Sequence, residues 1–437
     1  MRDLLILGIV LSVLPFALLH PRIGVLLWTW ISIMNPHRLA FGFAFSAPFG
    51  TVAAAVVFLS LFITRDKIRM PWASPVVALL LFVLWMCLTT AFAIDPAGSL
   101  TQLEKVLKIQ LMTGVALMVL HERRHIELFV WVNVLSIGFY GLKGGIFTLL
   151  TGGQHRVWGP DGSFIGDNNT LAVAIIIVIP LINYLRMVAT RRAVRLGLLA
   201  LMVLCGLSAL GSQSRGALVA ITAMTLFLWH RSNRKVVFGV AIASVASALL
   251  AFMPSSWDER MGSIGAYETD ESAQSRFGSW GFCIKVANDR PLGGGFDVYG
   301  TTNYAIYAPA VKGTPVAHSI YFSVLGEHGY VGLGLFLLLW WLTWREAARM
   351  RKESAKRSEL AWIHALAGMC QVSLIGYLVG GAFLQLAYFD LPYNIMVMVV
   401  VARRWMRQED WKRETSGAFG SGNPVTGVQL AHPEPVR

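Results

Sequence analysis

The chain has 437 residues, of which 55% are hydrophobic and only 14% are charged, and its mean hydropathy is +0.59. A soluble domain carries about a quarter charged residues, so this composition excludes an ordinary soluble protein. The net charge of +13 would favour nucleic-acid binding in a soluble protein, but here the cations stand in short connectors between apolar blocks, as the positive-inside bias of membrane proteins requires.

The apolar blocks have the length of helices that cross a membrane. Hydrocarbon forces the backbone to be bonded internally, and strand-like alternation is absent, so the pattern predicts an all-α integral membrane protein. We expect about twelve transmembrane helices in one polytopic domain over residues 1–414. The blocks run approximately over residues 4–20, 22–34, 48–64, 75–93, 104–120, 126–150, 169–187, 195–210, 215–230, 236–253, 319–343, 361–383 and 388–402.

The sequence does not decide how the first two apolar blocks are arranged. Residues 4–20 and 22–34 are separated only by His20, Pro21 and Arg22. They predict two short helices, one kinked helix, or one span followed by an interfacial piece. The first block has a signal-like apolar core but no small-residue cleavage site, so we expect it to be retained.

The connectors alternate in charge from residue 65 onward. By the positive-inside rule, the basic set is expected to be cytoplasmic and the other set periplasmic. The basic connectors are 65–69, 121–125, 186–195, 230–235, 345–357 and 403–413; the others are 93–102, 152–169, 211–216, 254–318 and 384–392.

Residues 254–318 form one large periplasmic loop in this topology. Loops of this length tend to be functional or disordered. The stretch SAQSRFGSWGFCIKVAND (272–289) predicts an amphipathic helix lying at the membrane interface. The glycines of PLGGGFDVYG predict a tight turn after it. Residues 415–437, rich in Gly, Pro and Ser, predict a disordered cytoplasmic tail.

Arg215 is the first candidate for chemistry, in the string GSQSRGALVA. Ser212 or Ser214 is a plausible N-cap, which puts Arg215 in the first turn of a membrane helix, where free N–H groups attract phosphate. A cation there is unfavourable unless an anion is near. The structural alternative is an arginine that reaches out to lipid headgroups.

The large loop supplies two further candidates. Arg276 lies beside Phe277 and Trp280; it is either a phosphate clamp, since a guanidinium grips two phosphate oxygens at once, or an anchor to lipid. His318 lies at the start of a long apolar run. A lone histidine is more often structural, but its side chain is the one best suited to take a proton near neutral pH. His328, further along, is expected to be a packing residue.

The connector HRVWGPDGSFIGDNNTLA carries Arg156, Asp161, Asp167, Asn168 and Asn169. Its structural interpretation is a turn-rich loop with an Asn cap on the next helix. Its functional interpretation is a polar wall, with Ser214, of an outer cavity that Arg215 and His318 would share. The sequence has no Walker-type loop, no His/Cys metal spacing and no paired acidic motif, so we expect neither a metal nor a cofactor.

These motifs, in this order, resemble the O-antigen ligase superfamily, which also holds O-antigen polymerases and protein O-oligosaccharyltransferases. The resemblance covers about residues 150–345. It rests on R-x-x-G…DNNTLA, S-x-S-R-G, S-R-F-x-x-W, N-D-R-P-L-G-G-G-F and H-S-x-Y-F-x-x-L-x-E-x-G-x-x-G-L. The string LLWTWISIMNPHRLAFGFAF is similar to a subgroup described as putative O-glycosylation ligases. The chain departs from the family at His318-Ser319, where H-N is common, and at Asp167-Asn168-Asn169, where D-P-N is common.

The resemblance implies an inverting glycosyltransferase of the bacterial inner membrane with a periplasmic active site. The donor would be a glycan on undecaprenyl pyrophosphate, and the acceptor a sugar hydroxyl of lipid A–core. His318 matches the family's essential histidine, and Arg215 and Arg276 match its pyrophosphate-binding arginines. The departure at 167–169 leaves the role of Asn169 open.

Three other functions are alternatives to a ligase: a related transferase, a transporter and a structural scaffold. A polymerase or a protein O-oligosaccharyltransferase would use the same donor and differ in the acceptor. A transporter of polyprenyl-linked glycans would favour charges in mid-membrane and internal repeats; Lys143 is the main intramembrane charge, and no repeat is visible. A structural scaffold would not explain arginines at the outer connectors.

Overall fold

The computed structural model describes residues 1–232 and 271–408, together with a few residues between them: 234–237, 239, 240, 243, 244, 247 and 254. More than half of the helix expected at 236–253 and residues 255–270 of the large loop therefore fall outside the described residues. The tail expected at 415–437 falls wholly outside them.

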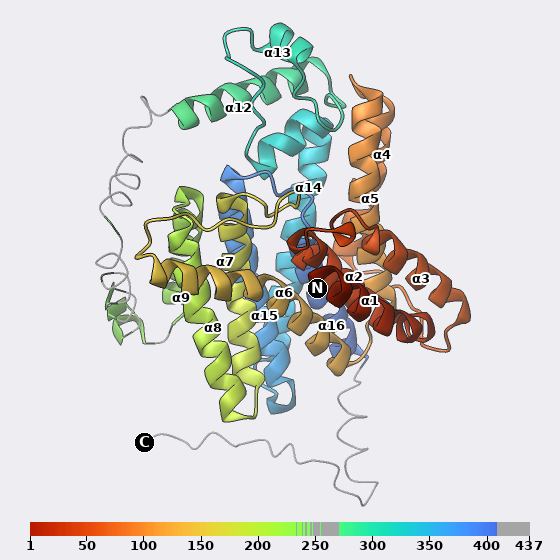
Figure 1. Cartoon of the computed structure of the whole chain (residues 1–437), viewed down its shortest axis with the longest axis vertical. Coiled ribbons are helices and arrows are strands. Elements are labelled where there is room, and N and C mark those ends of the chain that lie inside the picture. Colours follow the sequence, from red (N-terminus) through yellow and green to blue (C-terminus); the bar gives the residue numbers. More distant parts are fainter. Residues whose placement is uncertain are drawn as a thin grey trace, which may run out of the picture.

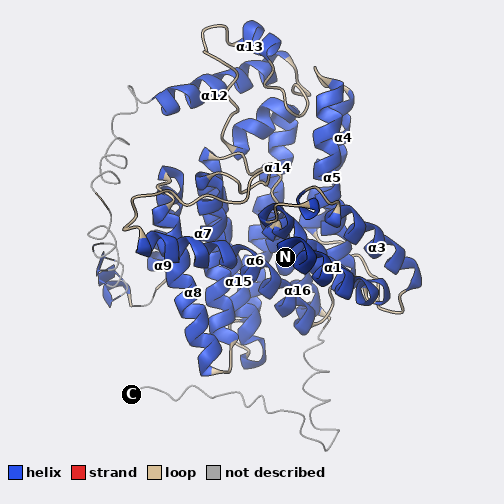
Figure 2. Cartoon of the chain, viewed as in Figure 1, coloured by secondary structure: helices blue, strands red, loops and turns tan. Residues whose placement is uncertain are grey.

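The described residues form helices and connectors, with no strand among them (Figure 1, Figure 2). The expected all-α class is confirmed, and every expected apolar block within the described ranges contains a helix. The α-helices are α1 Arg2–Leu19, α2 Pro21–Met34, α3 Phe49–Ile63, α4 Ser74–Ala91, α5 Pro96–Val119, α6 Arg123–Leu150, α7 Asn168–Val188, α8 Arg192–Gly211, α9 Arg215–Arg231, α12 Glu271–Asp289, α13 Thr301–Tyr307, α14 Ile320–Ser354, α15 Ala361–Gly380 and α16 Asp390–Arg407; short 3-10 turns are η1 Pro36–Leu39, η2 Phe43–Phe45, η4 Ser358–Leu360 and η5 Gly381–Phe383.

Within the described residues, seven helical segments are long and apolar enough to cross a membrane. The protein is therefore a multi-pass membrane protein by composition and helix length, while the total of about twelve spans remains a prediction. The segment over α7 is the most enclosed of the seven, with 72% of its apolar window buried. It packs against α8 and α15 and forms the centre of the bundle.

The N-terminal region consists of two separate helices, so the alternative of one kinked helix is wrong. Whether α2 spans the membrane or lies at its interface stays a prediction. Helix α1 ends before His20, whose backbone is extended (φ −129°). Helix α2 begins with Pro21, a residue suited to the first turn of a helix. Helices α1, α2 and α3 pack on one another around a core of their own that includes Val10, Ile31 and Ala53. This unit lies beside the main bundle (Figure 1).

Helices α12 and α13 form a cap over one end of the bundle (Figure 1). The expected helix at 272–289 is confirmed as α12. The cap has a separate core in which Phe282 stacks on Tyr304, with ring centroids 4.1 Å apart. Because the cap packs directly on α14, the position of α14 decides where the cap lies.

The glycine-rich turn at residues 291–300 joins the cap to a kink in α14 by backbone hydrogen bonds. Gly329 has φ 67° and ψ −172°, which interrupts the helix. The freed carbonyls of Gly326 and Glu327 accept hydrogen bonds of 2.9 Å from the backbone N–H groups of Gly294 and Gly295. The tight turn expected from the glycines is thus confirmed, and its function is to satisfy backbone groups that the kink exposes.

Gly329→Ala should lower the free energy of unfolding. A Cβ there would lie 2.1 Å from the carbonyl oxygen of Pro291, and the left-handed conformation alone costs about 1–3 kcal/mol for a residue with a side chain. Thermal unfolding of the purified protein in detergent measures the loss. Gly334→Ala is the control: it lies in the regular part of α14 with no atom within 4 Å of its Cβ position, and it should stabilise the helix by up to about 1 kcal/mol. Equal melting temperatures for the two variants would contradict the proposed role of the kink at Gly329.

Candidate functional site

Three helices, α7, α9 and α14, begin at one junction below the cap. The side chain of Asn168 donates a 2.8 Å hydrogen bond to the carbonyl of Ser212, which joins the start of α7 to the α8–α9 turn. The short turn η5 then bridges α9 and α14: a Cβ on Gly381 would lie 2.7 Å from the Ile320 side chain. The N-terminal ends of three helices, each with backbone N–H groups that lack an intrahelical partner and with a positive dipole end, therefore converge.

His318 lies at this junction, immediately before the N-cap of α14. Its φ of 44° is left-handed, a conformation that is uncommon for a residue other than glycine and that must be imposed by its surroundings. The neighbours impose it, because Ala317 and Ser319 are buried and the indole N–H of Trp280 donates a 2.8 Å hydrogen bond to the Ala317 carbonyl. The imidazole itself is exposed.

Arg276 is brought above the start of α14 by α12. It lies one turn before Trp280, whose ring stacks on Phe322 of α14 with centroids 4.7 Å apart and an interplanar angle of 12°. The same tryptophan therefore positions the backbone of His318 and the helical turn that carries Arg276. The sequence identified Trp280 only as an aromatic neighbour of Arg276; its pairing with Ala317 and Phe322 depends on the fold.

The charges around His318 favour a neutral ring. Partial burial and the Arg276 guanidinium lower the pKa of His318, and the Asp167 carboxylate opposes them without cancelling the shift. The ring is reachable from solvent and yet surrounded by enough protein to disfavour its charge. A neutral imidazole at neutral pH is the form that accepts a proton.

Asp167 belongs to the connector that the sequence predicts as a polar wall, and the structure gives it two roles that the sequence did not predict. Its carboxylate caps α7 by accepting hydrogen bonds from the backbone N–H groups of Asn169 and Thr170. The expected Asn cap is therefore wrong, because the chain enters the helix one residue earlier than the asparagines. An acidic residue before a helix signals a cap, but its electrostatic contact with His318 is not visible in the sequence.

Of the two expected caps, Ser214 rather than Ser212 caps α9. The Ser214 side chain accepts a 3.3 Å hydrogen bond from the backbone N–H of Ala217, and Arg215 is the first residue of α9. Gln213, with φ 55°, makes the sharp turn that precedes it. Arg215 thus lies at the junction, in a first turn where a cation is favourable only opposite an anion.

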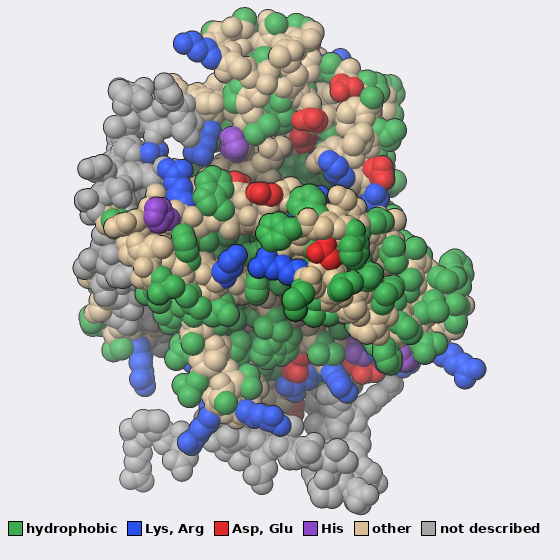
Figure 3. Space-filling view, in the orientation of Figure 1, with side chains coloured by type: hydrophobic (Ala, Val, Ile, Leu, Met, Phe, Trp, Pro, Cys, Tyr) green, Lys and Arg blue, Asp and Glu red, His purple; other side chains and the backbone are tan. Residues whose placement is uncertain are grey.

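Arg156 and Asn169 complete the polar wall. Arg156 donates from Nε to the side-chain oxygen of Gln213 at 3.4 Å, and Gln213 donates to the Gly153 carbonyl at 3.2 Å. Asn169, the second residue of α7, donates to the Asn168 side chain at 3.3 Å. Figure 3 shows basic, histidine and acidic side chains together on the face between the cap and the bundle.

His328 belongs to the joint between the cap and the bundle. It is fully buried, its Nδ1 lies 2.7 Å from the Thr89 hydroxyl, and it packs edge-on against Phe296. Its neighbour Glu327 accepts a 2.6 Å hydrogen bond from Tyr388. The expectation that His328 is a packing residue is confirmed.

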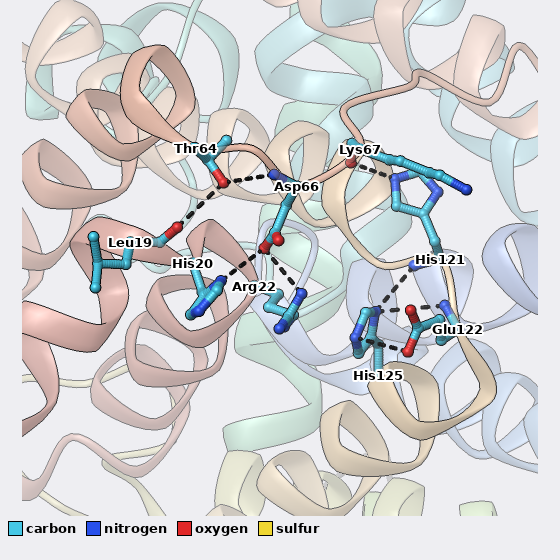
Figure 4. Close-up of polar contacts among 9 residues, drawn as sticks. All are labelled: Leu19, His20, Arg22, Thr64, Asp66, Lys67, His121, Glu122 and His125. Carbon is cyan, nitrogen blue, oxygen red and sulfur yellow. Dashed lines mark hydrogen bonds and ion pairs between the residues drawn. The ribbon is translucent and has the colours of Figure 1, made fainter.

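Other histidines form a separate cluster at the far end of the bundle (Figure 4). Asp66 accepts a 2.9 Å hydrogen bond from Arg22 and contacts His20 at 3.2 Å, while His125 lies 3.4 Å from the Glu122 carboxylate. Helix α6 separates this cluster from the 151–167 connector, and its 28 residues span roughly 40 Å. This cluster is therefore not part of the candidate site.

The basic connectors also gather at that far end. A hollow of about 1090 Å³ is lined by residues of the 65–69 and 121–125 connectors and of the C-terminal end of α16, and a second one joins 68–74 to Glu346, Arg349 and Arg403–Arg407. Connectors expected to lie on one side of the membrane thus converge in space, while the side itself remains a prediction.

Comparison with known protein families divides the chain in two. Residues 200–337 match the O-Antigen ligase family, and residues 1–190 match a family of unknown function (DUF5935). The first match runs from α8 into α14, and so includes Ser214, Arg215, Arg276 and His318. No curated protein matches the chain.

Within residues 200–337 the chain is similar to the O-Antigen ligase family. The resemblance to the O-antigen ligase superfamily is confirmed, and it supports an enzyme of the glycosyltransferase type. The match begins at residue 200, so Arg156, Asp167 and Asn169 lie in the segment shared with the family of unknown function. The junction is therefore built from both matched segments. The likeness to putative O-glycosylation ligases stays a prediction.

The ionisation of His318 should respond to its two charged neighbours in opposite directions. Its pKa should lie below the ordinary value of about 6.5. Arg276→Gln removes a cation that disfavours the imidazolium, so the pKa should rise; Asp167→Asn removes an anion that favours it, so the pKa should fall. Asparagine still caps α7, which protects the fold.

Histidine-selective carbon-13 labelling with NMR titration in detergent measures these shifts, and a His318→Asn sample identifies the signal. If both variants moved the pKa in the same direction, or neither moved it, the two side chains would not act on His318 as the geometry indicates.

Proposed function

We propose that the protein is an O-antigen ligase that transfers a glycan from undecaprenyl pyrophosphate to a sugar hydroxyl of lipid A–core, at the periplasmic face of the bacterial inner membrane. The observation that carries the proposal is the position of His318: an accessible imidazole of lowered pKa, influenced by Arg276 and Asp167, at the start of α14. The match of residues 200–337 supports the reaction class.

The proposed reaction is a single inverting displacement. His318 removes the proton from the acceptor hydroxyl, whose oxygen attacks the anomeric carbon from the face opposite the leaving group. The bond from that carbon to the pyrophosphate oxygen breaks, and undecaprenyl pyrophosphate leaves with the bonding electrons. The new glycosidic bond has inverted configuration, and the proton stays on His318 until solvent removes it.

The neighbouring charges suit the two halves of this step. Arg276, with Arg215 at the positive end of α9, would bind the pyrophosphate and stabilise the charge that builds up on it; one such donor is typically worth about 3 kcal/mol, or ~100-fold in rate. Asp167 favours the imidazolium that forms when His318 takes the proton. Arg156, Ser214 and Asn169 would line the same cavity.

His318→Ala should abolish glycan transfer, because general-base help is worth roughly 100- to 10,000-fold. His318→Asn should do the same; asparagine tolerates the left-handed backbone, which separates loss of the base from loss of structure. Arg215→Ala should reduce the rate ~100-fold. Purified protein with defined undecaprenyl-pyrophosphate donor and lipid A–core gives the rates.

The matched control is His230→Ala, an exposed histidine in the last turn of α9 that lies far along that helix from Arg215. It should transfer at the unsubstituted rate. Full activity of His318→Asn would remove the histidine from the mechanism. Transfer to a peptide, or to a second lipid-linked glycan, in preference to lipid A–core would replace the ligase by a protein O-oligosaccharyltransferase or a polymerase.

Transfer should continue in excess EDTA. In the proposed mechanism arginines and helix N-termini, rather than a divalent cation, offset the charge of the leaving pyrophosphate. Rates are compared before and after chelation and after adding Mg²⁺ back. A strict requirement for Mg²⁺ would contradict the metal-independent mechanism.

A further inference from the structure

A second cationic cavity lies beside the candidate site. It has a volume of about 210 Å³ and lies between α6, the end of η1 and the segment 156–160. None of its lining residues is acidic. Its polar and aromatic lining consists of Tyr140, Lys143, Phe147, Arg156 and Trp158.

Lys143 is out of place in its helix. It lies seven residues before the end of α6, a segment apolar enough to span the membrane, and thus roughly 10 Å inside the helix end. A charge at such a depth is costly and usually marks a ligand or an ion path. Within the described part of the chain, Lys143 makes no ion pair with an acidic side chain. A bound anion would supply the missing counter-charge.

Arg156 gives the cavity a second cation and links it to the junction. Its Nε is held 3.4 Å from the side-chain oxygen of Gln213, the residue before Ser214. Two cations converging on a small cavity without acids suit a phosphate group, since a guanidinium binds two of its oxygens and an ammonium neutralises a third.

The cavity walls suit an amphipathic ligand. Trp158 is 59% exposed beside the cavity, and Phe147 packs against the His155 ring, so apolar surface surrounds the cations. The hydroxyl of Tyr140 is already used, because it donates to the Met34 carbonyl. The arrangement fits a phosphate attached to a larger lipid-anchored molecule better than a free ion, since aromatic faces bind sugar rings and acyl chains.

We propose that the Lys143–Arg156 cavity binds a phosphate group of the lipid-anchored acceptor and holds that acceptor beside His318. This inference rests on the proposed function. It also gives a role to the segment shared with the family of unknown function, because every residue that lines the cavity lies within residues 1–190. A bilayer phospholipid offers the same phosphate chemistry and is the source to be distinguished.

The test is a binding measurement with lipid A that carries both phosphates and with the same lipid after dephosphorylation. Lys143→Gln should weaken binding of the phosphorylated lipid about tenfold, which corresponds to ~1.4 kcal/mol, and leave binding of the dephosphorylated lipid unchanged. Lys143→Arg keeps the charge and should bind as the unsubstituted protein does. Dissociation constants are measured in nanodiscs of zwitterionic lipid.

Lys105→Gln is the matched control. Lys105 is an exposed lysine of α5, nine residues from the start of that helix, and so lies at a similar distance from a helix end without lining this cavity. It should not change the binding. An equal loss in both variants would show a general effect of removing one lysine charge and would overturn the proposed site, as would unaltered binding by Lys143→Gln.

Competition distinguishes the two sources of phosphate. Phosphatidylglycerol added to the nanodiscs should displace phosphorylated lipid A only weakly; displacement at equal concentration would make the cavity a general headgroup site and overturn the acceptor assignment. The measurement needs no donor and no turnover. A protein that binds phosphorylated lipid A through Lys143 but transfers no glycan would contradict the proposed function and leave this inference standing.

Discussion

Hydrocarbon cannot hydrogen-bond a peptide group, and this constraint determines where the protein can place polar chemistry. Each span is a helix, and within a regular span the backbone N–H groups without an intrahelical partner are those of its first turn. The candidate site uses such ends: Asp167 caps α7, Ser214 caps α9 with Arg215 behind it, and His318 precedes α14. Membrane helices thus supply the positive ends that an anionic donor needs.

The kink at Gly329 extends the same constraint to the cap. A kinked helix loses backbone hydrogen bonds, and the glycine turn replaces them with bonds from Gly294 and Gly295 to α14. The first part of α14 is therefore held by the cap as well as by the bundle. Trp280 then joins α12 to the backbone beside His318. The position of the proposed base depends on packing far along the chain.

The two matched family segments meet at this junction. The segment with the O-antigen ligase match supplies His318, Arg276 and Arg215, and the segment matched to a family of unknown function supplies Asp167 and Arg156. An electrostatic contact (Asp167 with His318) and a hydrogen bond (Arg156 with Gln213) cross the boundary. This division fits a protein in which one segment carries the proposed transfer chemistry and the other tunes it and binds a substrate.

The sequence by itself determined the helical class, the helix positions and the basic set of connectors, because apolar length and charge asymmetry are local properties. It also singled out His318, Arg215 and Arg276 as candidates. Only the tertiary structure decided that Asp167, rather than an asparagine, caps α7 and acts on His318, that Trp280 bridges α12 and α14, and that Lys143 shares a cavity with Arg156. These relations join residues distant in the chain, and burial, helix register and contact across helices are fixed only when the helices pack.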